Sequence, residues 1–191
     1  MMNRRFGYSL VLAICLTFGL SSGANSGAAT KAGSNGLVMP HPEPWINAST
    51  GDLSKDLAKA TSEGKILTVF WEQVFCHYCK QMHEVNLKKP DILNYIKQNF
   101  YAVQLDMRGE GKVAGFDNET MSELKLAQRS NVRGTPTIIF YTPSGGEVAR
   151  MPGFGQPAVF KKVFEFVRLE AYKNHSMIEW ITAQFQKEAE G

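Results

Sequence analysis

The sequence predicts an α/β fold in which apolar strands alternate with amphipathic helices. Continuous apolar runs at residues 66–72 and 137–141 are typical of strands buried within a sheet. Other segments, such as residues 52–60 and 157–172, repeat their apolar residues at helical spacing. Since 43% of the 191 residues are hydrophobic and 20% are charged, the chain can bury the core of one domain.

The predicted helices follow from their end signals and their apolar spacing. Asp52 is a suitable N-cap for the first helix, and Gly64 ends it. Pro90 begins another helix, where the fixed φ of proline is favourable. Helices are predicted at residues 52–60, 76–85, 90–100, 122–130, 157–172 and 177–187.

The predicted strands are bounded by turns and loops. The segment Pro143-Ser144-Gly145-Gly146 is typical of a turn that joins two antiparallel strands. Residues 108–120 contain three glycines and mixed charges, which indicates a surface insertion. Strands are predicted at residues 66–72, 101–106, 137–141 and 147–151.

The N-terminus has the pattern of a secretory signal peptide. Two arginines precede an apolar stretch at residues 8–20, which is too short to span a membrane comfortably, and small residues follow it. We therefore expect a signal peptide at residues 1–28, cleaved after Ala24 or Ala28, with an uncleaved anchor as the alternative. The mature protein is expected to be periplasmic.

The remaining ranges complete the predicted domain organisation. Residues 29–51 are interpreted as a flexible lead-in followed by a strap that neighbouring prolines keep extended. In this strap Trp45 is expected to pack on the domain, whereas His41 is expected to be solvated. The domain is predicted at residues 52–172, with a C-terminal helical extension at residues 173–191.

The charge balance limits the classes of partner. The formal net charge is +3, and removal of the leader leaves 19 basic and 18 acidic residues. So small an excess of positive charge argues against nucleic acid or an anionic membrane as a partner.

The protein is expected to be a monomer.

The main functional signal is the segment Cys76-His77-Tyr78-Cys79, directly after the first predicted strand. At a helix N-terminus, unpaired amides and the helix dipole favour the thiolate of Cys76. Cys79 lies one turn further on, about 4.5 Å along the helix axis, so the two sulfurs can form a reversible disulfide. The third cysteine, Cys15, lies within the predicted leader.

The motif has three alternative uses, and each requires a different set of residues. A metal-binding carrier that uses both cysteines with His77 or His83 is the main alternative from another functional class. It lacks the second C-x-x-C or H-x-x-x-H motif that usually completes a zinc site, so neither a metal ion nor another cofactor is predicted. A c-type haem would need histidine where Lys80 stands. A structural disulfide over three residues would constrain little of the unfolded chain.

The order of elements, together with a second motif, resembles the thioredoxin fold. That motif is Gly134-Thr135-Pro136, ahead of a predicted strand, and the match covers roughly residues 52–172. The resemblance implies a central mixed sheet flanked by helices, here with an N-terminal extension and an extra C-terminal helix. It also implies a cis bond before Pro136, with Thr135 and Pro136 lying against the disulfide and binding the substrate.

The surroundings of the first motif are similar to those in exported SoxW-type thioredoxins. The likeness rests on residues 70–84, on Pro44-Trp45 and on the charged insertion. It implies periplasmic thiol chemistry, protein clients that contain disulfides, and a membrane thiol-electron donor. Thioredoxin itself has Gly-Pro between its cysteines and a buried aspartate, whereas this chain has His-Tyr, and Val69 or Phe70 in place of the aspartate. The reduction potential and the proton acceptor therefore do not transfer.

The predicted reaction is thiol-disulfide exchange. Cys76 is the expected nucleophile, exposed to the client, and Cys79 is the expected resolving thiol. The expected direction is reduction of periplasmic protein or sulphur-carrier disulfides. Disulfide oxidation and isomerisation remain alternatives.

Five neighbouring residues are expected to tune this pair or to bind clients. Glu72 is the candidate proton acceptor, with a solvated acid at the strand end as the alternative. A protonated His77 would stabilise the Cys76 thiolate. Tyr78, Trp71 and Phe75 would form an apolar docking rim.

Overall fold

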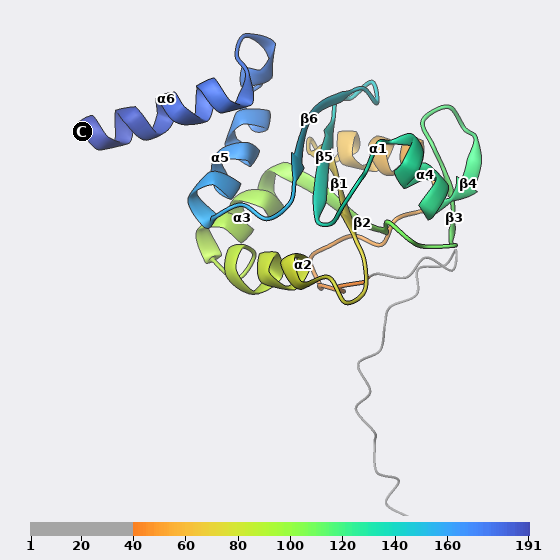
Figure 1. Ribbon diagram of the computed structural model, residues 1–191. Coiled ribbons are helices and arrows are strands. Elements are labelled where there is room, and N and C mark those ends of the chain that lie inside the picture. The colour runs from red at the N-terminus through yellow and green to blue at the C-terminus, as the bar shows by residue number, and fades with distance from the viewer. Residues whose placement is uncertain (1–39) are drawn as a thin grey trace, which may run out of the picture.

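The computed structural model describes residues 40–191 (Figure 1). The predicted signal peptide and nearly all of the predicted lead-in lie outside the described residues. Among the helices of residues 40–191, none has both the length and the hydropathy needed to cross a membrane.

A four-stranded mixed sheet forms the centre of the molecule, in the order β2-β1-β5-β6. The strands are β1 Ile66–Glu72, β2 Phe100–Asp106, β5 Thr137–Tyr141 and β6 Glu147–Pro152. β1 pairs in parallel with β2 and antiparallel with β5, which pairs antiparallel with β6. The mixed sheet and the hairpin between its last two strands are therefore confirmed.

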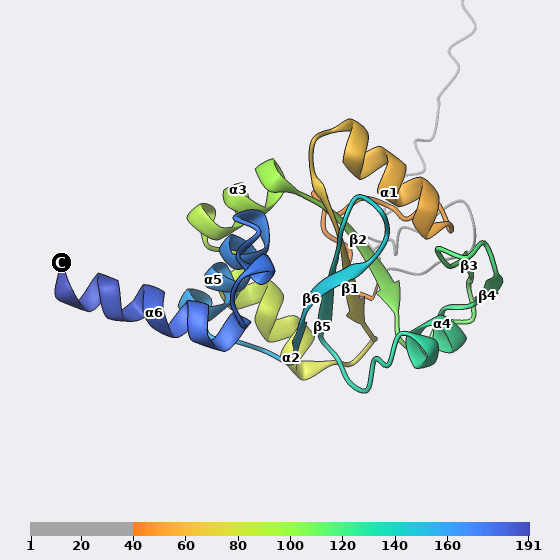
Figure 2. The same ribbon diagram turned by 90° about the horizontal axis from the view of Figure 1, so that it is seen from above.

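Helices cover both faces of this sheet. The α-helices of the described residues are α1 Leu53–Ser62, α2 His77–Gln81, α3 Pro90–Asn99, α4 Glu123–Arg129, α5 Pro157–Arg168 and α6 Met177–Glu190. Figure 2 shows α1 and α4 on one side of the sheet, with α3 and α5 on the other. The C-terminal helix α6 extends away from the sheet in both views and has no buried residue.

Two apolar clusters result, one on each side of the sheet. Phe70 of β1 lies in the cluster beneath α3 and α5, whereas Val69 and Trp71 face the cluster beneath α1 and α4. Because β1 is buried on both faces, its sequence is mostly apolar and does not alternate, with Thr68 and the final Glu72 as its polar residues.

The predicted insertion contains regular structure that the sequence pattern did not indicate. Its strands β3 Lys112–Ala114 and β4 Thr120–Ser122 form a second, two-stranded antiparallel sheet. With three residues each, these strands are too short to establish an alternating pattern.

The helix predicted at residues 157–172 ends earlier than expected. Helix α5 stops at Arg168, and Glu170 then adopts a left-handed conformation with φ of 53° before the short 3₁₀ turn Ala171–Lys173. A left-handed residue interrupts a right-handed helix, but glutamate gives no local signal for it.

The strap that precedes α1 runs along the outer edge of the sheet, beside β2. The Asn47 amide donates to the Ala102 carbonyl at 2.9 Å, and Trp45 packs edge-on against Phe70 with ring centroids 6.1 Å apart. The expected packing of Trp45 on the domain is confirmed. This path carries His41 toward the C-terminal end of β1.

Candidate active site

Cys76 and Cys79 form a disulfide at the start of helix α2. Cys76 is the N-cap of this helix, and its Sγ accepts a hydrogen bond from the Cys79 amide at 3.1 Å. The exposed fraction is 6% for Cys76 and 0% for Cys79. A partner can therefore reach only the first sulfur, although even this sulfur is less exposed than the sequence suggested.

The loop before β5 lies against the same sulfur. The Thr135–Pro136 bond is cis, and Thr135 Oγ1 donates a hydrogen bond to Cys76 Sγ at 3.2 Å. The sheet register explains this meeting, because Trp71 near the end of β1 is paired with Thr137 at the start of β5. Two motifs almost sixty residues apart thus meet at one edge of the sheet.

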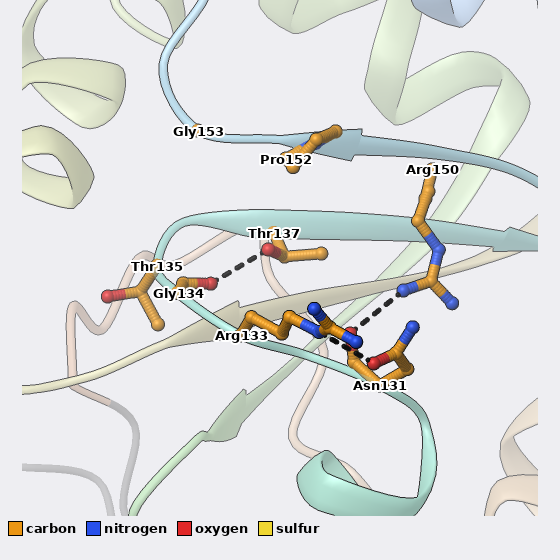
Figure 3. A pocket seen from close by; sticks show the side chains of 8 residues that line it. All are labelled: Asn131, Arg133, Gly134, Thr135, Thr137, Arg150, Pro152 and Gly153. Atoms are coloured by element: carbon orange, nitrogen blue, oxygen red, sulfur yellow. Dashed lines mark hydrogen bonds between the residues drawn. The ribbon is translucent and has the colours of Figure 1, made fainter.

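A pocket of about 320 Å³ opens beside this loop (Figure 3). Thr137 Oγ1 donates to the Gly134 carbonyl at 2.8 Å, and Arg133 Nε donates to Asn131 Oδ1 at 2.9 Å. The lining residues are Asn131, Arg133, Gly134, Thr135, Thr137, Arg150, Pro152 and Gly153. The pocket therefore continues the surface next to the disulfide and brings positive charge to it.

Exposed apolar side chains lie directly before the disulfide and between its cysteines in the chain. The exposed fraction is 101% for Phe75, 57% for Tyr78 and 48% for Val74. Trp71, which the sequence placed in this rim, is fully buried. That prediction is wrong because alternate residues of β1 point to opposite faces of the sheet, and Trp71 points into the core beneath α1 and α4.

His77 is exposed beside the disulfide. Its ring lies edge-on to Tyr78, with centroids 5.5 Å apart. Its predicted effect on the Cys76 thiolate stays a prediction.

Glu72 is fully buried at the end of β1 and is held by two side chains. His83 Nε2 lies 3.0 Å from each of its carboxylate oxygens, and Gln104 Nε2 donates to Oε1 at 2.8 Å. The alternative of a solvated strand-end acid is therefore wrong. His83 comes from the π-helical turn η1 Met82–Asn86, which directly follows α2.

Burial and two carboxylates act in opposite directions on the imidazole of His83. Burial opposes a positive charge on the imidazole, but hydrogen bonds and charge attraction from Glu72 and Glu43 outweigh it and raise the pKa of His83. Glu72 and Glu43 therefore favour the protonated form of His83.

His41 completes this group, although the sequence suggested that it is solvated. Its ring stacks on His83 with centroids 5.2 Å apart, and its Nε2 lies 3.8 Å from Glu72 Oε2. His41 Nε2, a Glu72 oxygen and Cys79 Sγ lie within 4.8 Å of one another. Sequence reasoning missed His41 because only the path of the strap along β2 brings it here.

Comparison with known proteins agrees with the geometry of this site. The family model described as "Thioredoxin-like domain" matches residues 53–168. The curated protein "Thiol:disulfide interchange protein DsbD" of Pseudoalteromonas atlantica is 24% identical over 157 residues, which cover 78% of this chain and 25% of that protein. The chain thus spans about a quarter of the length of this relative.

Solved structures of similar fold support the match. A thioredoxin-fold protein from Helicobacter pylori is 26% identical with a TM-score of 0.52, covering 65% of this chain and 81% of that one. A thioredoxin from Thermus thermophilus is 26% identical with a TM-score of 0.50, covering 64% and 86%. A putative disulphide-isomerase from Bacteroides thetaiotaomicron is 25% identical with a TM-score of 0.51, covering 64% and 91%.

Proposed function

Because the chain belongs to the thioredoxin-like domain family, and is a thiol-disulfide oxidoreductase with a Cys76–Cys79 pair, we propose that it reduces disulfides in exported client proteins. The observation that carries this proposal is the position of Cys76 Sγ. It lies at a helix N-terminus, beneath the Thr135 hydroxyl, and is the more accessible of the two sulfurs.

The reaction begins with the reduced pair. The Cys76 thiolate attacks a client disulfide, forms a mixed disulfide, and releases one client sulfur as a thiol. Cys79 then attacks the Cys76 sulfur, which releases the second client thiol and leaves the Cys76–Cys79 disulfide. Two electrons pass from the pair to the client. The hydrogen bonds from Thr135 Oγ1 and the Cys79 amide support the thiolate at Cys76.

Glu72 is the proposed acceptor for the proton that Cys79 loses in the second step. Its burial and its place within 4.8 Å of the Cys79 sulfur support this role. His83 and Gln104 orient its carboxylate. An acid in this position can take the proton without access to bulk water.

Clients are proposed to dock on the two surfaces that border the disulfide. On one side, Phe75 is fully exposed with φ of 61°, a conformation that is unfavourable for a bulky residue. Together with Tyr78 and Val74 it offers an apolar contact next to Cys76, and strained exposed residues of this kind cluster at ligand contacts. On the other side, Thr135, Pro136 and the adjoining pocket would receive the client backbone.

Export to the periplasm and reduction by a membrane thiol donor belong to the same proposal. The N-terminal sequence pattern supports export, and the similarity to the thiol:disulfide interchange protein DsbD supports thiol-disulfide interchange as the chemistry. The assignment to the SoxW type rests on residues 70–84, Pro44-Trp45 and the charged insertion alone. The likeness to a putative disulphide-isomerase keeps isomerisation as the second candidate.

The deciding measurement is the redox state of Cys76 and Cys79 in intact cells. Rapid acid quenching, alkylation of free thiols and electrophoresis would separate the dithiol from the disulfide, with the Cys76→Ser, Cys79→Ser double variant as the standard that has neither thiol. We expect mostly dithiol, which becomes disulfide when the membrane donor is deleted. A protein that is mostly disulfide with or without the donor would be an oxidase instead.

A further inference from the structure

We propose that the reduced protein binds one divalent metal ion of the zinc class through Cys79 Sγ, His41 Nε2 and a carboxylate oxygen of Glu72. These three atoms come from the start of α2, the strap and the end of β1, and they lie within 4.8 Å of one another. This ligand set differs from a chelate of the two cysteines. It also adds an activity to the disulfide exchange proposed above.

The distances are close to those of a four-coordinate zinc site. Bonds of about 2.0 Å to nitrogen and oxygen and about 2.3 Å to sulfur place tetrahedral ligand atoms about 3.3–3.7 Å apart. His41 Nε2 and Glu72 Oε2 are already 3.8 Å apart. Reduction frees the Cys79 sulfur from its bond to Cys76, so that the sulfur can approach the other two atoms by the remaining distance.

His41 supplies the clearest indication of a ligand. Its Nε2 is buried and has no hydrogen-bond partner. Buried polar atoms nearly always have a partner, so an orphaned atom requires an explanation. A neutral imidazole nitrogen of this kind is a common zinc ligand, and thiolate and carboxylate complete a donor set that zinc accepts.

The proposed ligands are held by surrounding hydrogen bonds. Gln104 accepts from the His41 amide at 3.3 Å and donates to the His41 carbonyl at 3.2 Å, while it also donates to Glu72. His83 Nε2 contacts the Glu72 carboxylate, and the His83 ring stacks on the ring of His41. Such outer contacts fix the orientation of ligands before the metal arrives.

The reaction balances without an oxidant or a reductant. The Cys79 thiol binds the ion as a thiolate and releases one proton to solvent, and the charges of Cys79 and Glu72 together neutralise the divalent ion. In the disulfide the Cys79 sulfur is not available as a thiolate. Binding is therefore limited to the reduced form, where the bound ion would block the resolving thiol.

Cobalt titration of the untagged Cys15→Ser protein tests this proposal, since this background leaves only Cys76 and Cys79. The protein is reduced, freed of reductant under nitrogen and titrated with Co²⁺ alone. We expect one ion per reduced chain, with a sulfur-to-cobalt charge-transfer band in the near ultraviolet. The disulfide form should show neither.

Variants in the same background separate the proposed ligands from a simple dithiol site. Cys79→Ser should remove the charge-transfer band. His41→Ala and Glu72→Gln should weaken binding by at least about tenfold, because loss of even a residue that only hydrogen-bonds to a metal ligand typically lowers affinity by about tenfold or more. Cys76→Ser should keep its affinity within about threefold of the parent. The matched control is His175→Ala, an exposed histidine far along the chain that should bind like the parent.

Two outcomes would overturn the proposal. One is a reduced parent that binds no cobalt. The other is equal weakening by Cys76→Ser and Cys79→Ser while His41→Ala binds like the parent, which would show a dithiol chelate. Far-ultraviolet circular dichroism and urea unfolding show whether His41→Ala and Glu72→Gln are folded, and His41→Gln replaces His41→Ala if that variant is unfolded. Disulfide exchange by the parent, measured with a chelator, needs no metal, so it tests the proposed reductase separately.

Discussion

Cys76 and Cys79 have different surroundings although the motif pairs them. Cys76 Sγ accepts hydrogen bonds from Thr135 Oγ1 and the Cys79 amide, whereas Cys79 is completely buried beside Glu72. Hydrogen bonds to sulfur favour its charged form, and burial disfavours it. The thiolate should therefore be at Cys76, and Cys79 should act only after Cys76 has reacted.

We predict that Cys79→Ser accumulates mixed disulfides with client proteins and that Cys76→Ser does not. The first variant keeps the accessible thiolate but cannot resolve the adduct, whereas the second keeps only the buried thiol. Alkylation followed by non-reducing electrophoresis would show the adducts, with about tenfold more in Cys79→Ser. Similar amounts in both variants would contradict these roles.

At the residue scale, the sequence identified a functional residue when both its residue type and its place within a predicted element indicated the role. The pair Cys76 and Cys79 follows from spacing, and Glu72 from its place at the end of a strand. His41 could not be found in this way, because its contact with Glu72 spans more than thirty residues and depends on how the strap docks. Trp71 was misplaced because a continuous apolar strand does not reveal which residue points to which face.

Among the elements, the start of α4 contains a buried acid outside the redox site. Glu123 is 1% exposed, and its Oε1 accepts a hydrogen bond from the Asp106 amide at 2.8 Å. Burial, opposed by this hydrogen bond and helped by the charge of Asp106, raises the pKa of Glu123 from 4.5 to about 7. The folded state thus favours the protonated carboxyl.

This pKa predicts that stability depends on pH through Glu123. Since the folded pKa lies above the unfolded one, the contribution of Glu123 is complete below about pH 4.5 and is lost as the pH rises through about 7. Glu123→Gln stays uncharged and can still accept the amide hydrogen, so this loss should disappear. Urea unfolding at pH 5 and pH 8 measures it. An unchanged difference between the two pH values in the variant would exclude Glu123 as its source.

Helices and strands that carry an apolar pattern over many residues were predicted well, whereas features that depend on only a few residues were not. The Asp52 N-cap of α1 is confirmed, because its side chain accepts from the amides of Ser54 and Lys55. The three-residue strands β3 and β4 were missed, and the end of α5 was misplaced because a left-handed glutamate resembles any other glutamate in sequence.

On the scale of the whole molecule, Phe164 of α5 joins elements that are distant in sequence. It is fully buried and lies 5.0 Å, between ring centroids, from each of three phenylalanines. These are Phe100 of β2, Phe140 of β5 and Phe160 of α5. Phe164 therefore links α5 to β2 and β5 within the cluster beneath α3 and α5.

We predict that Phe164→Ala lowers the free energy of unfolding by about 3–5 kcal/mol, because it removes buried area and leaves a cavity that its neighbours only partly fill. The matched control is Ile178→Ala in α6, where an apolar side chain is 80% exposed and the change should stay within about 0.5 kcal/mol. Denaturant unfolding measures both. A loss of less than about 1 kcal/mol for Phe164→Ala would mean that the cluster repacks around the gap.

The burial of Cys79 also determines how many proteins the chain can hold covalently. Its sulfur has no exposed surface, and Cys76 is the only sulfur of the pair that solvent reaches. An adduct formed through this pair therefore contains one copy of this chain and one client. Two clients cannot be bridged through the pair, so in the Cys15→Ser background even a crowded mixture of substrates would yield heterodimers and no larger cross-linked assemblies.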